Sequence, residues 1–142
     1  WADAGAGADA VAAMRATSFA VADLAGLDLG LHGGGGVLID SDAAGFGWYL
    51  DATPFDDLEF AGDNGPAGID LLTVVMHELG HVAGLDDHYS AAASDDVMFG
   101  FLREGERRAP EGAETESAGQ LGWAVMSVHD YATSQHHLDY WV

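Results

Sequence analysis

The chain has 142 residues, 49% of them hydrophobic, which is enough for one buried core, and we expect a single domain over residues 1–142. It has 24 acidic residues, four arginines and no lysine, so its formal charge of -20 makes nucleic acid a poor partner. No apolar run approaches the roughly 18 residues of a membrane-spanning helix. The absence of cysteine excludes disulfides and thiolate metal sites, so a metal would be held by histidine and carboxylate.

The negative charge has three interpretations. Carboxylates keep a surface hydrated, and an excess of aspartate without lysine also resembles proteins from high-salt environments. Clusters of aspartate could bind Ca²⁺, although no stretch matches a full calcium-loop pattern. The N-terminal residues do not have the pattern of a signal peptide, so such a segment is either removed or the chain is a module of a larger protein. The composition is ordinary for a secreted or cell-surface bacterial domain.

The first half of the chain predicts one helix followed by strands. Apolar residues recur at three- and four-residue steps over residues 8–25, which indicates a helix that Gly26 ends. The glycines at 33–36 form a turn before two short apolar runs, at residues 37–39 and 46–50, which we interpret as strands. Residues 51–66 are rich in turn formers and predict a long surface loop.

The clearest predicted element is a second helix over residues 69–85. Asp70 can cap its start, and Gly84 can end it in a left-handed turn. This helix is apolar on nearly all sides, so we expect it to be buried in the core. After it, residues 103–120 form a polar stretch, read as a loop that leads into a helix from about residue 114 to 130, and residues 131–142 form a tail.

Three polar side chains interrupt the apolar second helix. His77 and His81 are one turn apart on one face, so both imidazoles can reach one ion at about 2 Å. Glu78 is badly placed as a ligand beside them but well placed to contact a water on the metal, which is the position of a general base. Core histidines with a paired glutamate are the alternative, but burying these groups without a partner is expensive.

The residues that follow His81 indicate the kind of zinc site. Gly84 allows a sharp turn, so a third ligand can come from the next loop. The sequence from His77 to Asp87, HELGHVAGLDD, resembles the metzincin signature HExxHxxGxxH/D. Asp87 falls at the family's third ligand position, and His88 one place later is the alternative third ligand.

The resemblance extends to Met98, which lies where the shorter metzincins, such as the matrixins, have a methionine in a tight turn beneath the metal. Two places further on, where many members have a tyrosine, this chain has Gly100. The surrounding sequence looks like matrixin-like modules of large bacterial surface proteins. This implies an α+β fold: a small twisted mixed sheet packed on the buried active-site helix, with a compact C-terminal subdomain.

The resemblance also implies the activity of a zinc endopeptidase that acts on peptide or protein substrates as a monomer or as a module. Zinc would lower the pKa of its bound water. Glu78 would take the proton from this water and later return it to the leaving amine. In the family, a strand at the sheet edge pairs with an extended substrate, and the region of residues 37–50 is the candidate here.

Two rival interpretations remain open. In a gluzincin the third ligand would be a later glutamate such as Glu104, although its surroundings do not predict a helix. In a non-catalytic module, zinc would be purely structural, for example if Asp87 and His88 both bound it in a closed site. Four other histidines have no helical partner at metal spacing, and we assign them to packing or surface: His32, His129, His136 and His137.

Overall fold

The computed structural model describes residues 1–62, 65–111 and, for the backbone, 124–128. Its elements, in chain order, are α1 (Ala8–Ala16), β1 (Ser18–Ala22), β2 (Asp28–Gly33), β3 (Gly36–Asp40), β4 (Trp48–Tyr49), β5 (Ile69–Asp70), α2 (Leu71–Val82), β6 (Phe101–Leu102) and β7 (Ala124–Val128). Short 3-10 turns cover Leu58–Phe60 and Ala91–Ala93. The chain therefore forms a small mixed α+β fold, as the sequence predicts at this level.

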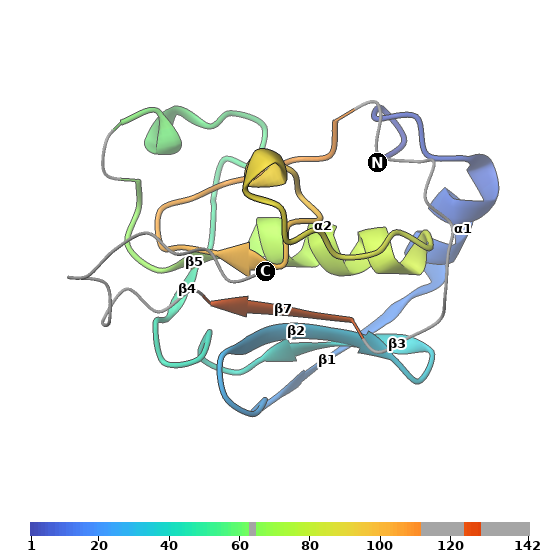
Figure 1. The fold of residues 1–142 in the computed structure, drawn as a ribbon, viewed down its shortest axis with the longest axis horizontal. Coiled ribbons are helices and arrows are strands. Elements are labelled where there is room, and N and C mark those ends of the chain that lie inside the picture. Colours follow the sequence, from blue (N-terminus) through green and yellow to red (C-terminus); the bar gives the residue numbers. More distant parts are fainter. Residues whose placement is uncertain (63–64, 112–123, 129–142) are drawn as a thin grey trace.

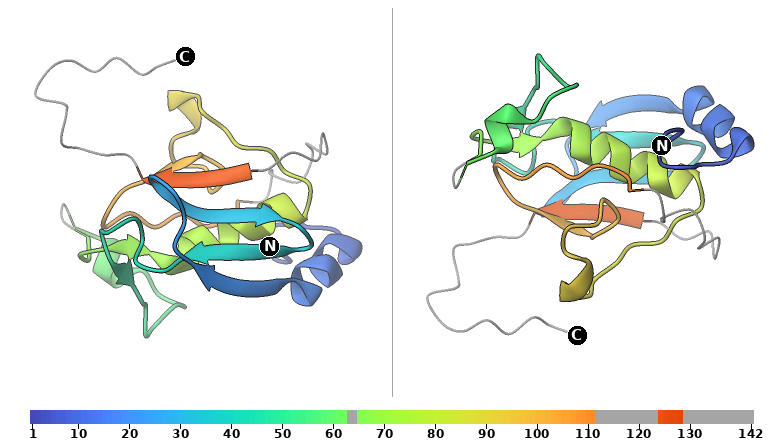
Figure 2. Two further views of the ribbon diagram at one scale, coloured as in Figure 1. Left: turned by 90° about the horizontal axis from the view of Figure 1, so that it is seen from below. Right: turned by 90° about the horizontal axis from the view of Figure 1, so that it is seen from above.

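Helix α2 lies along one face of a mixed sheet (Figure 1). The strands β1, β3 and β2 form one side of this sheet, which β7 and β6 extend in the order β1-β3-β2-β7-β6. Figure 2 shows β7, β2, β3 and β1 side by side in this order. The pairs β1–β3 and β6–β7 are parallel, whereas β2 is antiparallel to both β3 and β7. A separate two-stranded sheet joins β4 to β5.

The predicted glycine turn is the loop of a hairpin between β2 and β3. Gly33 pairs with Gly36, and the two residues between them, Gly34 and Gly35, have φ values of 61° and 89°. Positive φ at both positions is the geometry of the tight turns that suit the twist of antiparallel strands, and glycine adopts it without strain. Strand β3 confirms the predicted strand at residues 37–39.

The first helix is shorter than predicted, because α1 ends at Ala16 and residues 18–22 form β1. Thr17 has extended backbone angles, and its hydroxyl donates to the Ala13 carbonyl at 3.0 Å. Beyond it, Phe19 and Val21 alternate with small residues, which suits a strand. These residues gain a partner in β3, to which they pair in parallel.

Further along the chain, two other elements differ from their predictions. Only Trp48–Tyr49 of the predicted strand at 46–50 is a strand. The helix predicted at about 114–130 is wrong where the structure describes it, because Ala124–Val128 is β7, which pairs with β2 and β6. The rest of that prediction and the tail lie outside the described residues.

Helix α2 is shorter than the predicted span of residues 69–85, because Ile69–Asp70 form β5 and the helix ends at Val82, but its start at Asp70 and its stop at Gly84 are those predicted. Asp70 precedes it, and the Asp70 carboxylate accepts from the Thr73 amide at 3.0 Å and the Thr73 hydroxyl at 2.7 Å. At the other end, Gly84 has a φ of 90°, and the Leu85 amide donates to the Gly80 carbonyl at 3.1 Å. This pattern is a Schellman cap, which reverses the chain direction and leads it back along the helix.

Two groups of buried apolar residues hold α2 in place. The larger fills the space between α2 and the sheet and comprises Leu29, Val37, Ile39, Ala43, Ile69, Val74 and Leu102. The smaller lies alongside the C-terminal half of the helix, in the segment that returns from Gly84, and comprises Leu85, Val97 and Met98. Because both groups contact α2, its polar side chains have fixed surroundings. In the described residues no helix has the length and hydropathy needed to cross a membrane.

Candidate metal centre

Three side chains converge beside the C-terminal half of α2. The Nε2 atoms of His77 and His81 are 3.0 Å apart, and Asp87 Oδ1 lies 3.0 Å from the first and 3.3 Å from the second. His77 is fully buried, and 7% of His81 is exposed. The Schellman cap brings Asp87 back to the two imidazoles. In the described part of the chain, this is the one group of three such residues whose ligand atoms meet.

The other nitrogen of each imidazole faces a backbone carbonyl. His77 Nδ1 is 2.8 Å from the Val97 oxygen, and His81 Nδ1 is 2.8 Å from the Leu85 oxygen. A carbonyl only accepts, so each Nδ1 carries the proton and each neutral imidazole turns an Nε2 lone pair toward Asp87. Such contacts with carbonyls are the usual way in which proteins orient metal-binding histidines.

The convergent atoms therefore need a positive charge between them. Two nitrogen lone pairs and a carboxylate oxygen repel one another at these distances, and buried Asp87 Oδ1 has no hydrogen-bond donor among the described residues. A tetrahedral zinc ion at about 2.0–2.1 Å from its ligands separates neighbouring ligand atoms by roughly 3.3 Å. The observed separations of 3.0–3.3 Å fit that geometry, so the three residues suit a zinc ion.

In the metal-free molecule, a proton can take the place of the metal. Burial lowers the pKa of His81, but Asp87, the Leu85 carbonyl and the charge of Glu78 outweigh burial, so the pKa of His81 is raised. Burial raises the pKa of Asp87, but its contacts with His77 and His81 hold that pKa well below its ordinary range. Both pKa shifts have the same cause, which is that a positive charge is favourable at this point.

Glu78 lies on α2 between the ligand helix face and β2. It is fully buried, and its side chain contacts the backbone of β2 at Gly30. A Cβ atom on Gly30 would lie 2.5 Å from Glu78 Oε1, so only glycine leaves room for the carboxylate there. Since the charge of Glu78 acts on His81, the carboxylate is near the metal-binding atoms but is not one of the three that converge.

Met98 lies in a tight turn beneath the ligand helix. The Phe99 amide donates to the Asp96 carbonyl at 3.0 Å, and the Asp96 side chain accepts from the Met98 amide at 2.7 Å. Met98 is 1% exposed, and its sulfur contacts the helix at Gly80, where an added Cβ would overlap it. The predicted turn is present, and Gly80, between His77 and His81, is what lets Met98 approach.

The alternative third ligands lie away from the two histidines. His88 Nε2 is 3.4 Å from Asp96 Oδ2, and 44% of the His88 side chain is exposed. Glu104 accepts from the Gly68 amide at 3.1 Å. The structure therefore brings Asp87, and neither of these residues, to the imidazoles. His129, His136 and His137 lie outside the described residues.

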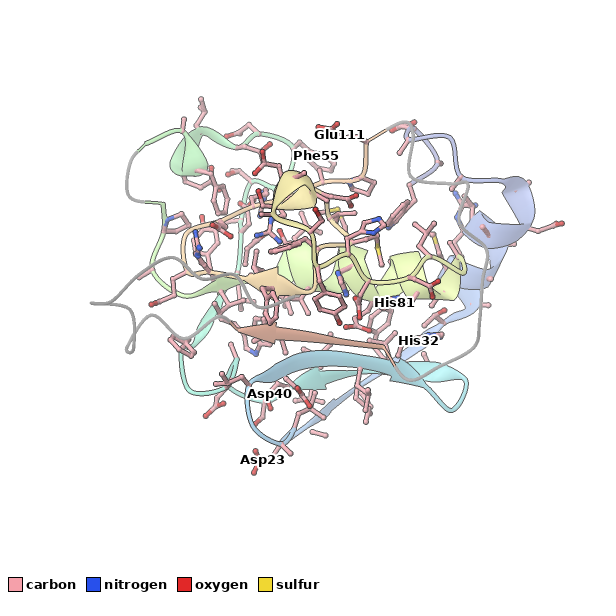
Figure 3. All side chains as sticks on the ribbon, in the orientation of Figure 1. Asp23, His32, Asp40, Phe55, His81 and Glu111 are labelled. Carbon is pink, nitrogen blue, oxygen red and sulfur yellow. The ribbon has the colours of Figure 1, made fainter. Side chains whose placement is uncertain are left out.

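Two residues near the centre were not predicted to belong to it. The imidazole of His32 on β2 stacks on that of His81, with ring centroids 6.4 Å apart, and both lie in the space between α2 and the sheet (Figure 3). Burial and the nearby His81 lower the pKa of His32. Tyr89 donates a hydrogen bond to Asp87 Oδ2 at 2.9 Å. Burial and this hydrogen bond raise the pKa of Tyr89 to about 12.

The region of residues 37–50, expected to hold an edge strand, contains β3 and β4. Strand β3 has β1 on one side and β2 on the other, so for β3 the prediction is wrong, whereas β4 pairs only with β5 in the small second sheet. Strand β2 contacts the site through Gly30 and His32. One edge of β2 pairs with β3, and the opposite edge pairs with β7 at Met126 and Ala124. In the described residues, the strand nearest the centre is thus paired on both sides.

Comparisons of the chain with family models, with curated proteins and with solved structures give no match.

Proposed function

We propose that this protein is a zinc-dependent endopeptidase of the metzincin type, with His77, His81 and Asp87 as metal ligands. The observation that carries the proposal is the convergence of three lone-pair donors at separations that suit a zinc ion. The glycine turn after α2 and the buried Met98 beneath it add support, because both follow the pattern of that family.

Three protein ligands leave a position for a substrate or a water, which is the arrangement of catalytic rather than structural zinc. A zinc ion held there would act as a Lewis acid, polarising the scissile carbonyl and acidifying water. His77 and His81 are oriented by the carbonyls of Val97 and Leu85, so they bind without rearrangement.

Glu78 supplies the acid–base chemistry in this proposal. It would accept a proton from the attacking water and donate it to the amine that leaves when the peptide bond breaks. Its burial beside Gly30 fixes the carboxylate in one place, and the low dielectric strengthens its effect on nearby charge. A positioned general base of this kind contributes roughly 10²- to 10⁴-fold to the rate.

The test replaces Glu78 with glutamine, which has the same shape but accepts no proton. We expect Glu78→Gln to bind zinc as the parent does and to hydrolyse casein at least about 10²-fold more slowly. Glu104→Gln is the matched control, because the amide oxygen can still accept from Gly68 and the residue lies away from the centre. It should keep full activity and zinc content.

Two results would contradict the proposal. Hydrolysis by Glu78→Gln at the parental rate would show that Glu78 is not the general base. Loss of zinc from Glu104→Gln would favour the gluzincin ligand set. Zinc content by mass spectrometry and casein hydrolysis should be measured on the same preparations.

A non-catalytic zinc module is the second candidate, and the pairing of β7 with β2 favours it. A peptide that adds to β2 beside the centre would have to displace β7. X-ray absorption spectroscopy at the zinc edge, which identifies the ligands of the ion, separates the two functions. Two imidazoles, one carboxylate and a solvent oxygen support the enzyme, whereas a fourth protein ligand together with inactivity on casein supports the structural module.

A further inference from the structure

The two oxygens of the Asp87 carboxylate have different partners. Oδ1 faces the Nε2 atoms of His77 and His81, whereas Oδ2 accepts a hydrogen bond of 2.9 Å from the Tyr89 hydroxyl. A carboxylate with no such second partner can rotate and offer either oxygen, or both, to an ion. Here the hydroxyl fixes which oxygen points at the imidazoles.

The loop that carries Tyr89 is held by backbone hydrogen bonds. The His88 amide donates to the Met98 carbonyl at 2.7 Å, and the Gly100 amide donates to the His88 carbonyl at 3.0 Å. This bridge places the loop after Asp87 against the segment that follows the Met98 turn. Tyr89 is therefore positioned by the same two segments that form the centre.

Gly100 provides the surface on which the Tyr89 ring lies. A Cβ atom at Gly100 would come within 2.6 Å of Tyr89 Cε1, and Phe101 contacts the ring edge-on at a centroid distance of 5.7 Å. Tyr89 is 58% exposed, so apolar burial alone does not explain the orientation of its ring. The glycine makes room for the ring, and Asp87 gives its hydroxyl a partner.

We propose that Tyr89 is a positioning residue that holds Asp87 as a one-oxygen ligand of the metal ion. This inference rests on the proposed metal centre but does not depend on peptide hydrolysis. Tyr89 acts through Asp87, and its hydroxyl group is the part that matters. Partners of metal ligands typically affect metal affinity by roughly 10- to 100-fold, and the exposure of Tyr89 places it near the lower value.

The first experiment removes only the hydroxyl. We expect Tyr89→Phe to bind zinc about tenfold more weakly than the parent in competition with a chromophoric chelator. Tyr49→Phe is the matched control, because the Tyr49 hydroxyl also donates to a carboxylate, that of Glu59 at 3.0 Å, and belongs to a different cluster. Its zinc affinity should equal that of the parent.

A second variant reaches the same interaction from the other side. Gly100→Ala introduces a Cβ atom where the Tyr89 ring lies, so the ring must move away from Asp87. We expect a loss of zinc affinity similar to that of Tyr89→Phe, and the double variant should lose no more than the larger single effect. The visible spectrum of the cobalt-substituted protein, which reports ligand geometry, should change in both variants.

The outcomes separate this inference from the proposed function. If the parent binds zinc and Tyr89→Phe binds it equally tightly with an unchanged cobalt spectrum, Tyr89 does not position Asp87. A parent that binds no zinc would overturn the proposed centre and this inference with it. Urea unfolding of the metal-free variants controls for stability, since a purely structural role would lower stability in place of metal affinity.

Discussion

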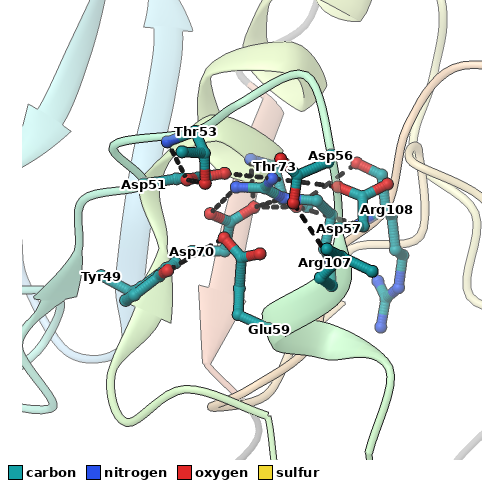
Figure 4. Close-up of polar contacts among 11 residues, drawn as sticks. Tyr49, Asp51, Thr53, Asp56, Asp57, Glu59, Asp70, Thr73, Arg107 and Arg108 are labelled. Carbon is teal, nitrogen blue, oxygen red and sulfur yellow. Dashed lines mark hydrogen bonds and ion pairs between the residues drawn. The ribbon is translucent and has the colours of Figure 1, made fainter.

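Helix α2 has a buried polar cluster at each end, and the two clusters obtain their positive charge differently. At its N-terminus, the carboxylates of Asp70 and Asp51 surround Arg107, whose guanidinium also contacts exposed Asp57 (Figure 4). The same guanidinium lies over the Phe60 ring. Near its C-terminus, His77, His81 and Asp87 meet, and this group contains no arginine. The first cluster contains its own cation, and the second is the one for which we propose a metal ion.

The contrast also bears on calcium. Aspartates are abundant in the chain, yet the two that are buried among the described residues, Asp40 and Asp70, already have partners. Arg107 makes two hydrogen bonds to Asp70, at 2.8 and 3.0 Å, and the Asp40 carboxylate accepts from three backbone amides. In the parts of the chain that are described, no group of three carboxylates converges in the way a calcium ion needs. The single group that does converge contains two imidazoles, which suit zinc better.

The largest expected effect on stability comes from removing the cation of the first cluster. Arg107→Met would leave Asp70, which is 1% exposed, without its ionic partner and should lower the free energy of unfolding by about 3–5 kcal/mol. Hydrogen bonding to Asp70 is the main cause that raises the pKa of Arg107, so the residue stays charged at any ordinary pH. Urea unfolding followed by circular dichroism measures the change.

The control for this prediction is Arg15→Met, which removes the same charge from an exposed position on α1. Such surface changes usually stay within about 0.5 kcal/mol. Equal stability of the two variants would mean that the Arg107 cluster does not hold α2. If Arg107→Met does not fold, Arg107→Lys, which keeps the charge and loses the paired hydrogen bonds, gives an intermediate value to measure.

The second effect comes from the zinc ion that we propose for the second cluster. Zinc at about 100 times its dissociation constant should raise the free energy of unfolding by about 2.7 kcal/mol, because only the folded chain brings the ligands together. Asp87→Asn should lose most of this increase, since the amide has no charge to offer. Asp86→Asn and His88→Gln change exposed neighbours and should keep it.

This comparison decides the third ligand. Loss of the zinc effect in His88→Gln, with its retention in Asp87→Asn, would assign the position to His88 and contradict the geometry. Thermal or urea unfolding with and without zinc gives the increase for each variant, after exchange into buffer with a chelator.

The sequence predicts best what depends on near neighbours. The spacing of His77 and His81 on one helix turn is local, as are the cap at Asp70 and the left-handed turn at Gly84. These features place α2 and two imidazoles without knowledge of the rest of the fold. The same turn also predicts that a third ligand comes from the next loop, but the choice of Asp87 over His88 required a family resemblance or a structure.

Features that depend on distant partners were not predictable. The Arg107 cluster joins residues that are 37 to 56 positions apart, and its sequence context reads as a polar loop. His32 meets His81 only because β2 lies under α2, and no spacing signals that contact. The boundary after α1 failed for the same reason, since pairing with β3 decides whether residues 18–22 extend or coil.

The smallest expected effect is a difference in pH dependence between the two clusters. A raised pKa of His81 means that its contribution to stability is fully present below about pH 6.5, the ordinary histidine value, and is lost as pH rises through its folded pKa. The lowered pKa of Asp87 works in the opposite direction, because its contribution is lost only as the solution becomes strongly acidic. The metal-free centre is therefore most stabilising between these limits, and Arg107 stays charged over the same range.

We expect the metal-free parent to lose free energy of unfolding between pH 5.5 and pH 8, and Asp87→Asn to lose less, because Asp87 is the main group that raises the pKa of His81 against burial. The difference between the two proteins is the quantity to measure, because it isolates the effect of the Asp87 charge on the two imidazoles beside it. With zinc the sign reverses, because the metal displaces the proton from the imidazoles and binds more tightly as pH rises. A parent and an Asp87→Asn variant with parallel pH profiles in chelator would show that no proton occupies the position where the metal is proposed to bind.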